Sequence, residues 1–142
     1  LHGTYRRVSS LPETVLQAFT TCDVETAKII NLIAILLDSR LFFDFLHEVY
    51  DEKIRLGEKE ITHRDLNVFF SDKALQSDVV AGWTDTAVRK LKQCFTRMMF
   101  EAGLLESSAK PRTIKPIHID YRTEELLTAN GLGEYLKAVK GV

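Results

Sequence analysis

Residues 83–106 have the sequence WTDTAVRKLKQCFTRMMFEAGLLE, and this stretch decides the fold that we expect. Apolar residues recur three and four positions apart, which is the period of an amphipathic helix. They are Val88, Leu91, Phe95, Met98 and Ala102. Thr84 is the expected N-cap, Trp83 and Val88 have the spacing of a hydrophobic staple, and Gly103 is expected to end the helix.

The opposite side of this helix is basic and polar. A step of about 100° per residue places one set of side chains directly opposite the apolar ones. This set is Arg89, Lys92, Gln93, Thr96 and Phe100, with Lys90 and Arg97 on the flank. The helix therefore pairs an apolar face with a basic one.

Charge is unevenly distributed along the 142 residues. The net charge is only −1, so the chain is not a polycation, and any nucleic-acid function must come from a local patch. Residues 84–115 contain seven basic and three acidic side chains, a net +4, whereas residues 41–79 contain five basic and nine acidic ones, a net −4.

Helix signals precede the basic segment. Ser10 and Glu13 match a capping box for a helix to about Phe19. Asp23 can cap a helix whose residues 29–37 are apolar on nearly all sides, as expected at the centre of a core. A further helix is expected over residues 41–57, capped by Asp38 or Ser39 and ended by Gly57. The next helix should open at Thr62, with Asp65 at its third position and with Ile61 and Leu66 at the spacing of a hydrophobic staple.

After Gly103 the pattern changes. Leu104–Leu105 and Thr113–Ile119 are predicted strands joined by a turn at 107–112, and Pro116 would confine the second to a sheet edge. Two short helices should follow, at 123–129 and 132–139. The expected fold is mainly α, a compact helical domain over 1–142 with a winged-helix-like helix-turn-helix and a short β-hairpin. Its parts would be a helical core (10–57), the winged-helix-like part (61–119) and C-terminal helices (120–142).

In a winged helix the last helix enters the DNA major groove and the hairpin reaches phosphates. We therefore expect DNA-binding side chains on both elements. They are Arg89, Lys90, Lys92, Gln93, Thr96 and Arg97 on the helix, and Lys110, Arg112 and Lys115 on the hairpin. One alternative is that the basic side is an ordinary solvated helix face. Another is a protein-interaction scaffold without DNA contact, in which Phe100 and the acidic segment 41–79 dock another protein or a second copy of the chain. Phe100 suits phosphate contact poorly and is the expected partner-binding residue.

Catalytic and metal-binding patterns give no support to an enzyme. His47-Glu48-x-x-Asp51 lacks the second histidine of a zinc helix. Asp44, Glu48, Asp51 and Glu52 could serve a metal nuclease only if other elements supplied more acids. The two cysteines, Cys22 and Cys94, have no zinc-ligand spacing and are expected to be buried free thiols. We expect a cytoplasmic protein with no cofactor, no metal site and no membrane span, and a homo-oligomer is a possible state.

Three segments together resemble the BrxA family of bacteriophage-exclusion (BREX) defence systems. They are FFDFLHEVYDEKIRLGEKEIT (42–62), DLNVFFSDKA (65–74) and WTDTAVRKLKQCFTRMMFEAGLL (83–105). The likeness lies in the order and spacing of apolar and basic positions, and it covers most of residues 10–140. None of these segments is a catalytic signature.

The resemblance implies a small, mainly helical, non-enzymatic component of a phage-defence island. It implies binding to double-stranded DNA through helix-turn-helix-like elements, and other defence subunits as partners. Family members are sometimes labelled inner-membrane proteins, a label that this sequence does not support. The resemblance also implies additional N-terminal helical sequence ahead of the segment matching Ser10, so that part of a DNA-binding surface would be absent here.

Overall fold

The computed structural model describes residues 11–107, 109, 112–115 and 117–140. Within these ranges the chain is helical, and the helices are linked by short turns and extended segments. In chain order they are α2 (Glu13–Thr21), α3 (Val24–Asp38), α4 (Arg40–Phe45), η1 (Leu46–Tyr50), α5 (Asp51–Leu56), α6 (His63–Gln76), α7 (Asp78–Ala81), α8 (Asp85–Glu101), α9 (Tyr121–Ala129) and α10 (Gly133–Lys140). The expectation of a mainly helical fold is confirmed.

Several helix boundaries follow from side-chain caps that the sequence predicted. Asp23 accepts from the Thr26 backbone N–H, Ser39 from that of Phe42, and Thr84 from that of Ala87. Each side-chain oxygen satisfies one of the free N–H groups at a helix start. Ser10, the expected first cap, lies outside the described residues, and α2 begins after Pro12 without a side-chain cap.

Gly57 and Gly103 mark two helix ends. Gly57 has a φ of 75° and Gly103 a φ of 88°. Backbones with such positive φ values favour glycine because it has no Cβ. Gly57 is the C-cap of α5, and Gly103 comes two residues after the end of α8.

The segment from Arg40 to Leu56 is one continuous helix whose middle turn, η1, is π-helical. The wider turn lies at Leu46–Tyr50 and buries both Leu46 and Tyr50 completely. The Tyr50 hydroxyl donates to the Leu104 carbonyl at 3.4 Å, so this turn contacts the segment that follows α8. Burial holds the pKa of the Tyr50 phenol well above its usual value.

Aromatic rings join the three helices that position the basic segment. Phe95 of α8 lies 4.9 Å from Phe42 and 5.5 Å from Phe45 of α4, and 5.6 Å from Phe70 of α6, measured between ring centroids. Phe45 also meets Phe69 of α6 edge-on at 5.1 Å. All five rings are buried. Aromatic packing at these distances stabilises the arrangement beyond the area buried.

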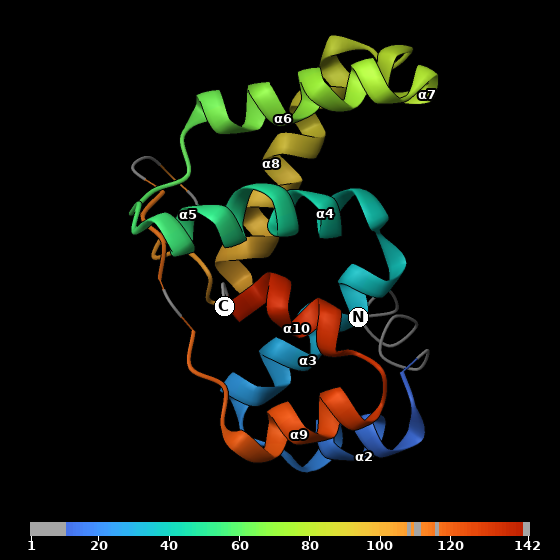
Figure 1. Cartoon of the computed structure of the whole chain (residues 1–142), viewed down its shortest axis with the longest axis vertical. Helices are drawn as coiled ribbons and strands as arrows, with labels where there is room; N and C mark the ends of the chain where they lie inside the picture. Colours follow the sequence, from blue (N-terminus) through green and yellow to red (C-terminus); the bar gives the residue numbers. More distant parts are fainter. Residues whose placement is uncertain (1–10, 108, 110–111, 116, 141–142) are drawn as a thin grey trace.

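Figure 1 shows the resulting arrangement, with α6 and α7 at one end and α2 and α9 side by side at the other. Helix α8 runs from the α6 end towards the middle, where α10 crosses the molecule between α3 and the α4–η1–α5 helix. Helix α3 is buried on most sides, as its apolar run predicted.

The expected β-hairpin is replaced by shorter contacts. No strand occurs in the described residues, which contain two isolated antiparallel bridges, Leu105 with Ile114 and Glu60 with Thr113. The hydrogen bonds around them place 112–115 between 104–106 and 59–61. They run from Glu106 N–H to Thr113 O (2.9 Å), Lys115 N–H to Leu104 O (2.8 Å), Ile61 N–H to Arg112 O (3.0 Å) and Ile114 N–H to Lys59 O (2.8 Å).

Candidate nucleic-acid interface

One side of α8 is anchored in the core, and the other side is left open. Phe95, Thr96 and Met99 are buried, and Val88, Leu91 and Met98 are half-buried against the same core. The Thr84 cap and the Phe95 ring contacts fix the helix at its start and its middle. The open side is therefore presented on a rigid support.

The open side is basic. Arg89, Lys90, Gln93 and Arg97 are all exposed. Lys90 and Arg97, which the sequence placed on the flank, are part of this exposed surface. None of the ion pairs found among the described residues involves Arg89, Lys90 or Arg97. We call Arg89, Lys90, Gln93 and Arg97 the basic face of α8.

Two residues expected on this face lie elsewhere. Thr96 is buried, and its hydroxyl donates to the carbonyls of Lys92 (3.2 Å) and Gln93 (3.0 Å). Lys92 is half-buried towards α6, where its ammonium group donates to the Asn67 side-chain oxygen. Thr96 cannot reach a groove, and Lys92 already has a partner within the protein. For Lys92 the cause is packing against α6, because the apolar stem of a lysine can cover hydrophobic surface.

Asn67 was not singled out from the sequence. It lines a hollow between α6 and α8 together with Phe70, Trp83, Val88, Arg89 and Lys92. A polar residue on a polar helix face gives no sequence signal for such a contact.

The extended segment 112–115 lies beside α8 and adds further basic groups. Arg112 is half-buried and lines a second hollow with Lys90, Gln93, Cys94, Thr96 and Arg97. Lys115 is exposed and lines a different hollow, next to the start of α3. Lys110 lies outside the described residues. The structure thus brings Arg112 to the basic face and leaves Lys115 apart from it.

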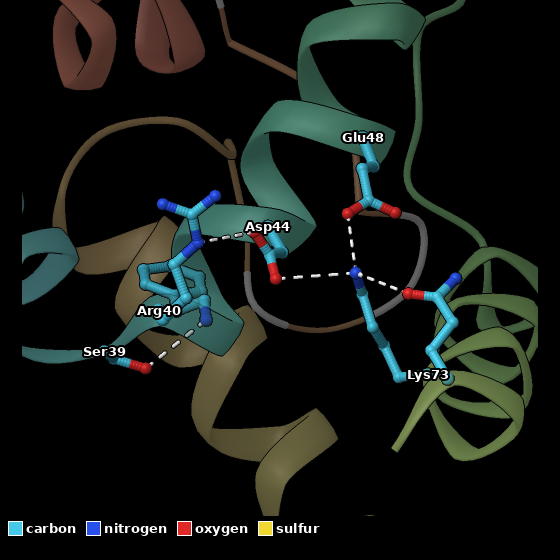
Figure 2. Close-up of polar contacts among 7 residues, drawn as sticks. Ser39, Arg40, Asp44, Glu48 and Lys73 are labelled. Atoms are coloured by element: carbon cyan, nitrogen blue, oxygen red, sulfur yellow. Dashed lines mark hydrogen bonds and ion pairs between the residues drawn. The ribbon is translucent and has the colours of Figure 1, made fainter.

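The acidic half of the chain is largely paired within itself. Figure 2 shows Lys73 of α6 reaching Asp44 of α4 (3.4 Å) and Glu48 of η1 (2.7 Å), while Arg40 contacts Asp44 at 3.0 Å. Although burial by itself would lower the pKa of Lys73, these two carboxylates raise it above the usual value. The network ties α6 to the α4–η1 helix and withdraws Asp44 and Glu48 from metal binding.

A second pairing secures the start of α6. Asp65 accepts from the Thr62 backbone N–H at 2.7 Å, and Lys53 of α5 contacts the same carboxylate at 2.7 Å. Burial by itself would raise the pKa of Asp65, but the Lys53 and Thr62 hydrogen bonds outweigh it and hold the pKa below its usual range. The predicted start of α6 at Thr62, with Asp65 at its third helical position, is confirmed. The two residues form a capping box, which Lys53 strengthens from a neighbouring helix.

Phe100 is 43% exposed on the open side of α8. Exposed single apolar residues are common and need no special account. Its position beside the basic face nevertheless leaves a large ring available to a partner.

The described parts of the chain contain neither a metal site nor a membrane-spanning helix. No group of three or more His, Cys, Asp or Glu side chains there could hold a metal ion. No helix in those parts is both long enough and apolar enough to cross a bilayer. Cys22 and Cys94 are unbridged and half-buried, so the expectation of free thiols holds while that of full burial does not.

Comparison with known proteins places the chain in a family. The BrxA family model matches residues 2–131. A relative from Bacillus cereus (strain H3081.97), named BREX protein BrxA, is 36% identical over 135 residues, which are 95% of this chain and 68% of that protein. A solved structure of an uncharacterized protein from Magnetospirillum magneticum superposes with a TM-score of 0.83 at 18% identity, over 96% of this chain and 71% of that one, and shares the fold. The matched length and the 36% identity show that this chain belongs to the BrxA family.

Proposed function

We propose that this protein binds double-stranded DNA as a non-enzymatic accessory component of a BREX phage-defence system. The observation that carries the DNA-binding part is the basic face of α8, three exposed cationic side chains and Gln93 on a helix held rigidly by the Phe95 cluster. The defence role rests on membership of the BrxA family and on the name of the Bacillus cereus relative.

The order of elements around α8 supports a winged-helix mode of docking. The elements follow one another in this order: a helix (Arg40–Leu56), an extended segment (59–61), α6, α8 and two extended segments (104–106 and 112–115). The backbone of 112–115 hydrogen-bonds to both 59–61 and 104–106. In a winged helix the last helix lies in the major groove and the following segments contact the backbone. α7 occupies the turn between α6 and α8, which makes that turn longer than in a simple helix-turn-helix.

In this docking the cationic side chains would bind phosphates, and Gln93 would face base edges. Arginine and lysine contacts to phosphates position a protein on the duplex, whereas glutamine can read adenine in the major groove. Arg89, Lys90 and Arg97 form no ion pair with another described residue, so none of the salt bridges found there must be broken before DNA binds.

A salt-titrated binding assay on duplex DNA tests the proposal. With about four phosphate contacts, log K is expected to fall with log salt concentration at a slope near −3.6. The double variant Lys90→Glu, Arg97→Glu should weaken binding at every duplex sequence and make the slope shallower. The matched control is Arg122→Glu, Lys137→Glu, the same charge change at exposed positions on α9 and α10. Absence of binding at low salt, or equal loss in both double variants, contradicts the proposal.

A protein-binding scaffold is the second candidate, and Phe100 favours it. Its ring is exposed next to a helix face that could also contact an acidic surface. In that role, Phe100→Ala should weaken association with another defence subunit or with a second copy of this chain, and duplex DNA should not compete for the site.

A further inference from the structure

The hollow between α8 and segment 112–115 contains positive charge and no counter-charge. It is lined by Lys90, Gln93, Cys94, Thr96, Arg97 and Arg112 and has a volume of about 490 Å³. Among the lining residues that the structure describes, three of six are cationic and none is acidic. No Asp or Glu occurs among the residues outside the described ranges either, so the sequence supplies no hidden side-chain carboxylate for this hollow.

Arg112, one of the residues that line this hollow, has an unsatisfied donor in its side chain. Its Nε is buried and has no hydrogen-bond partner among the described residues. The Arg112 backbone is held in place, because its carbonyl accepts from the Ile61 N–H at 3.0 Å. A buried donor without a partner costs free energy, and such groups in native proteins call for an explanation, of which an absent ligand is one.

The chemistry of the lining favours a phosphate group. A guanidinium offers several N–H donors in a fixed plane, which match the oxygens of a phosphate, and two more cations nearby balance its charge. Lys90 and Arg97 belong both to this hollow and to the basic face of α8, so a ligand in the hollow is continuous with whatever covers that face.

We propose that this hollow seats one backbone phosphate of duplex DNA, with Arg112 as its central donor and Lys90 and Arg97 on either side. This inference rests on the proposed DNA-binding function and adds a defined anchoring position to it. The seated phosphate fixes how α8 lies along the groove, while the rest of the basic face contacts the same duplex.

Cys94 provides a probe inside the hollow, and Cys22 provides an internal control. Both thiols are free, and Cys22 lies at the end of α2. The experiment measures the rate of iodoacetamide labelling at each cysteine by peptide mass spectrometry, with and without duplex DNA at low salt. Duplex DNA should slow labelling of Cys94 and leave Cys22 unchanged. Inorganic phosphate, compared with chloride at equal ionic strength, should slow Cys94 in the same way at higher concentration.

Arg112→Gln tests the anchor, and Arg122→Gln is the matched control. In Arg112→Gln the protection of Cys94 should be lost, and the salt slope of duplex binding should become shallower by about 0.9, the share of one phosphate. Arg112→Lys keeps the charge but not the planar donors, and it should retain the slope while protecting Cys94 less. A thermal melt of each variant shows that it is folded.

The two proposals fail in different ways. If the duplex binds but Cys94 is not protected, or if Arg112→Gln leaves both protection and slope unchanged, the anchoring inference is overturned and DNA binding stands. If the duplex does not bind at low salt, the proposed function fails and this inference fails with it. Protection of Cys94 by an acidic peptide but not by duplex DNA or phosphate would assign the hollow to a protein partner and overturn the inference.

Discussion

The ammonium group of Lys92 lies 6.0 Å from the centre of the Phe70 ring, so a lysine of α8 is directed at α6 rather than at solvent. The same group donates to the Asn67 side chain. An ammonium group over an aromatic face is attracted by the negative charge of that face. Lys92 therefore joins two helices, although its position on a helical wheel suggested an open basic face.

Because Lys92 faces α6, we expect substitutions of Lys92 and Arg97 to affect the salt dependence of DNA binding differently. Arg97→Met removes an exposed cation, so the salt slope of duplex binding should become shallower by about 0.9. Lys92→Met keeps an apolar stem against Phe70, and the slope should stay unchanged. Fluorescence anisotropy over a salt series measures both. Equal changes in the two variants would show that Lys92 leaves Asn67 and contacts DNA.

The aromatic cluster predicts that Phe95 and Phe100 of α8 contribute very differently to the free energy of unfolding. Phe95→Ala should lower the free energy of unfolding by about 3–5 kcal/mol, because it leaves a cavity between Phe42, Phe45 and Phe70. Phe100→Ala should change it by no more than about 0.5 kcal/mol, as expected for an exposed position. Urea denaturation gives both values. A large loss in Phe100→Ala would mean that the ring packs within the fold and is not free for a partner.

The Lys53–Asp65 pair predicts sensitivity to acid. The pKa of Asp65 is lowered in the folded protein, so its stabilisation is complete above its unfolded pKa of about 3.9 and is lost as pH falls through the lower folded value. Asp65→Asn should reduce stability near pH 7 by about 1–3 kcal/mol and flatten the pH dependence below about pH 4. Thermal melts across pH 2–7 measure this. Asp72→Asn, at an exposed position of the same helix, is the control.

The buried phenol of Tyr50 leads us to expect that the folded protein loses stability at high pH. Burial raises the pKa of its phenol, so the folded state favours the neutral form. Its stabilisation is complete below the unfolded pKa of about 10 and is lost as pH rises above it. Tyr50→Phe removes the bond to Leu104 at a cost of about 1 kcal/mol near pH 7, and should make the protein less sensitive above about pH 10. In the parent protein, ultraviolet titration should show the Tyr50 phenol ionising only at a pH above the usual pKa of tyrosine.

Most helix boundaries could be predicted because their signals are local. The caps at Asp23, Ser39, Thr62 and Thr84 each act on a backbone N–H three residues away. Two local features were missed. No helix was predicted at Asp78–Ala81, although Ser77 caps α7 there by the same mechanism. The π-helical turn at Leu46–Tyr50 has no recognised sequence signal.

The pairing of extended segments could be predicted only in part. Leu105 and Ile114 do pair, as the expected hairpin required, but through one bridge instead of a ladder. The contact of 112–115 with 59–61 was not predicted, because it joins segments about fifty residues apart by backbone hydrogen bonds that leave no mark on side-chain patterns.

The sequence alone determined that residues 85–101 form an amphipathic helix, where that helix begins and ends, and which family the chain resembles. These properties depend on interactions within one or two helical turns and on the linear order of residues. The tertiary structure alone decided which cationic side chains of α8 are turned towards the protein and which remain available to a ligand. Lys92 and Thr96 are turned towards the protein by packing against neighbouring elements, with Asn67 lying 25 residues before Lys92, while Lys90, Arg97 and Arg112 meet around one hollow. Since both flanks of α8 carry basic residues, only the position of its neighbours could distinguish the face that is buried from the face that remains open.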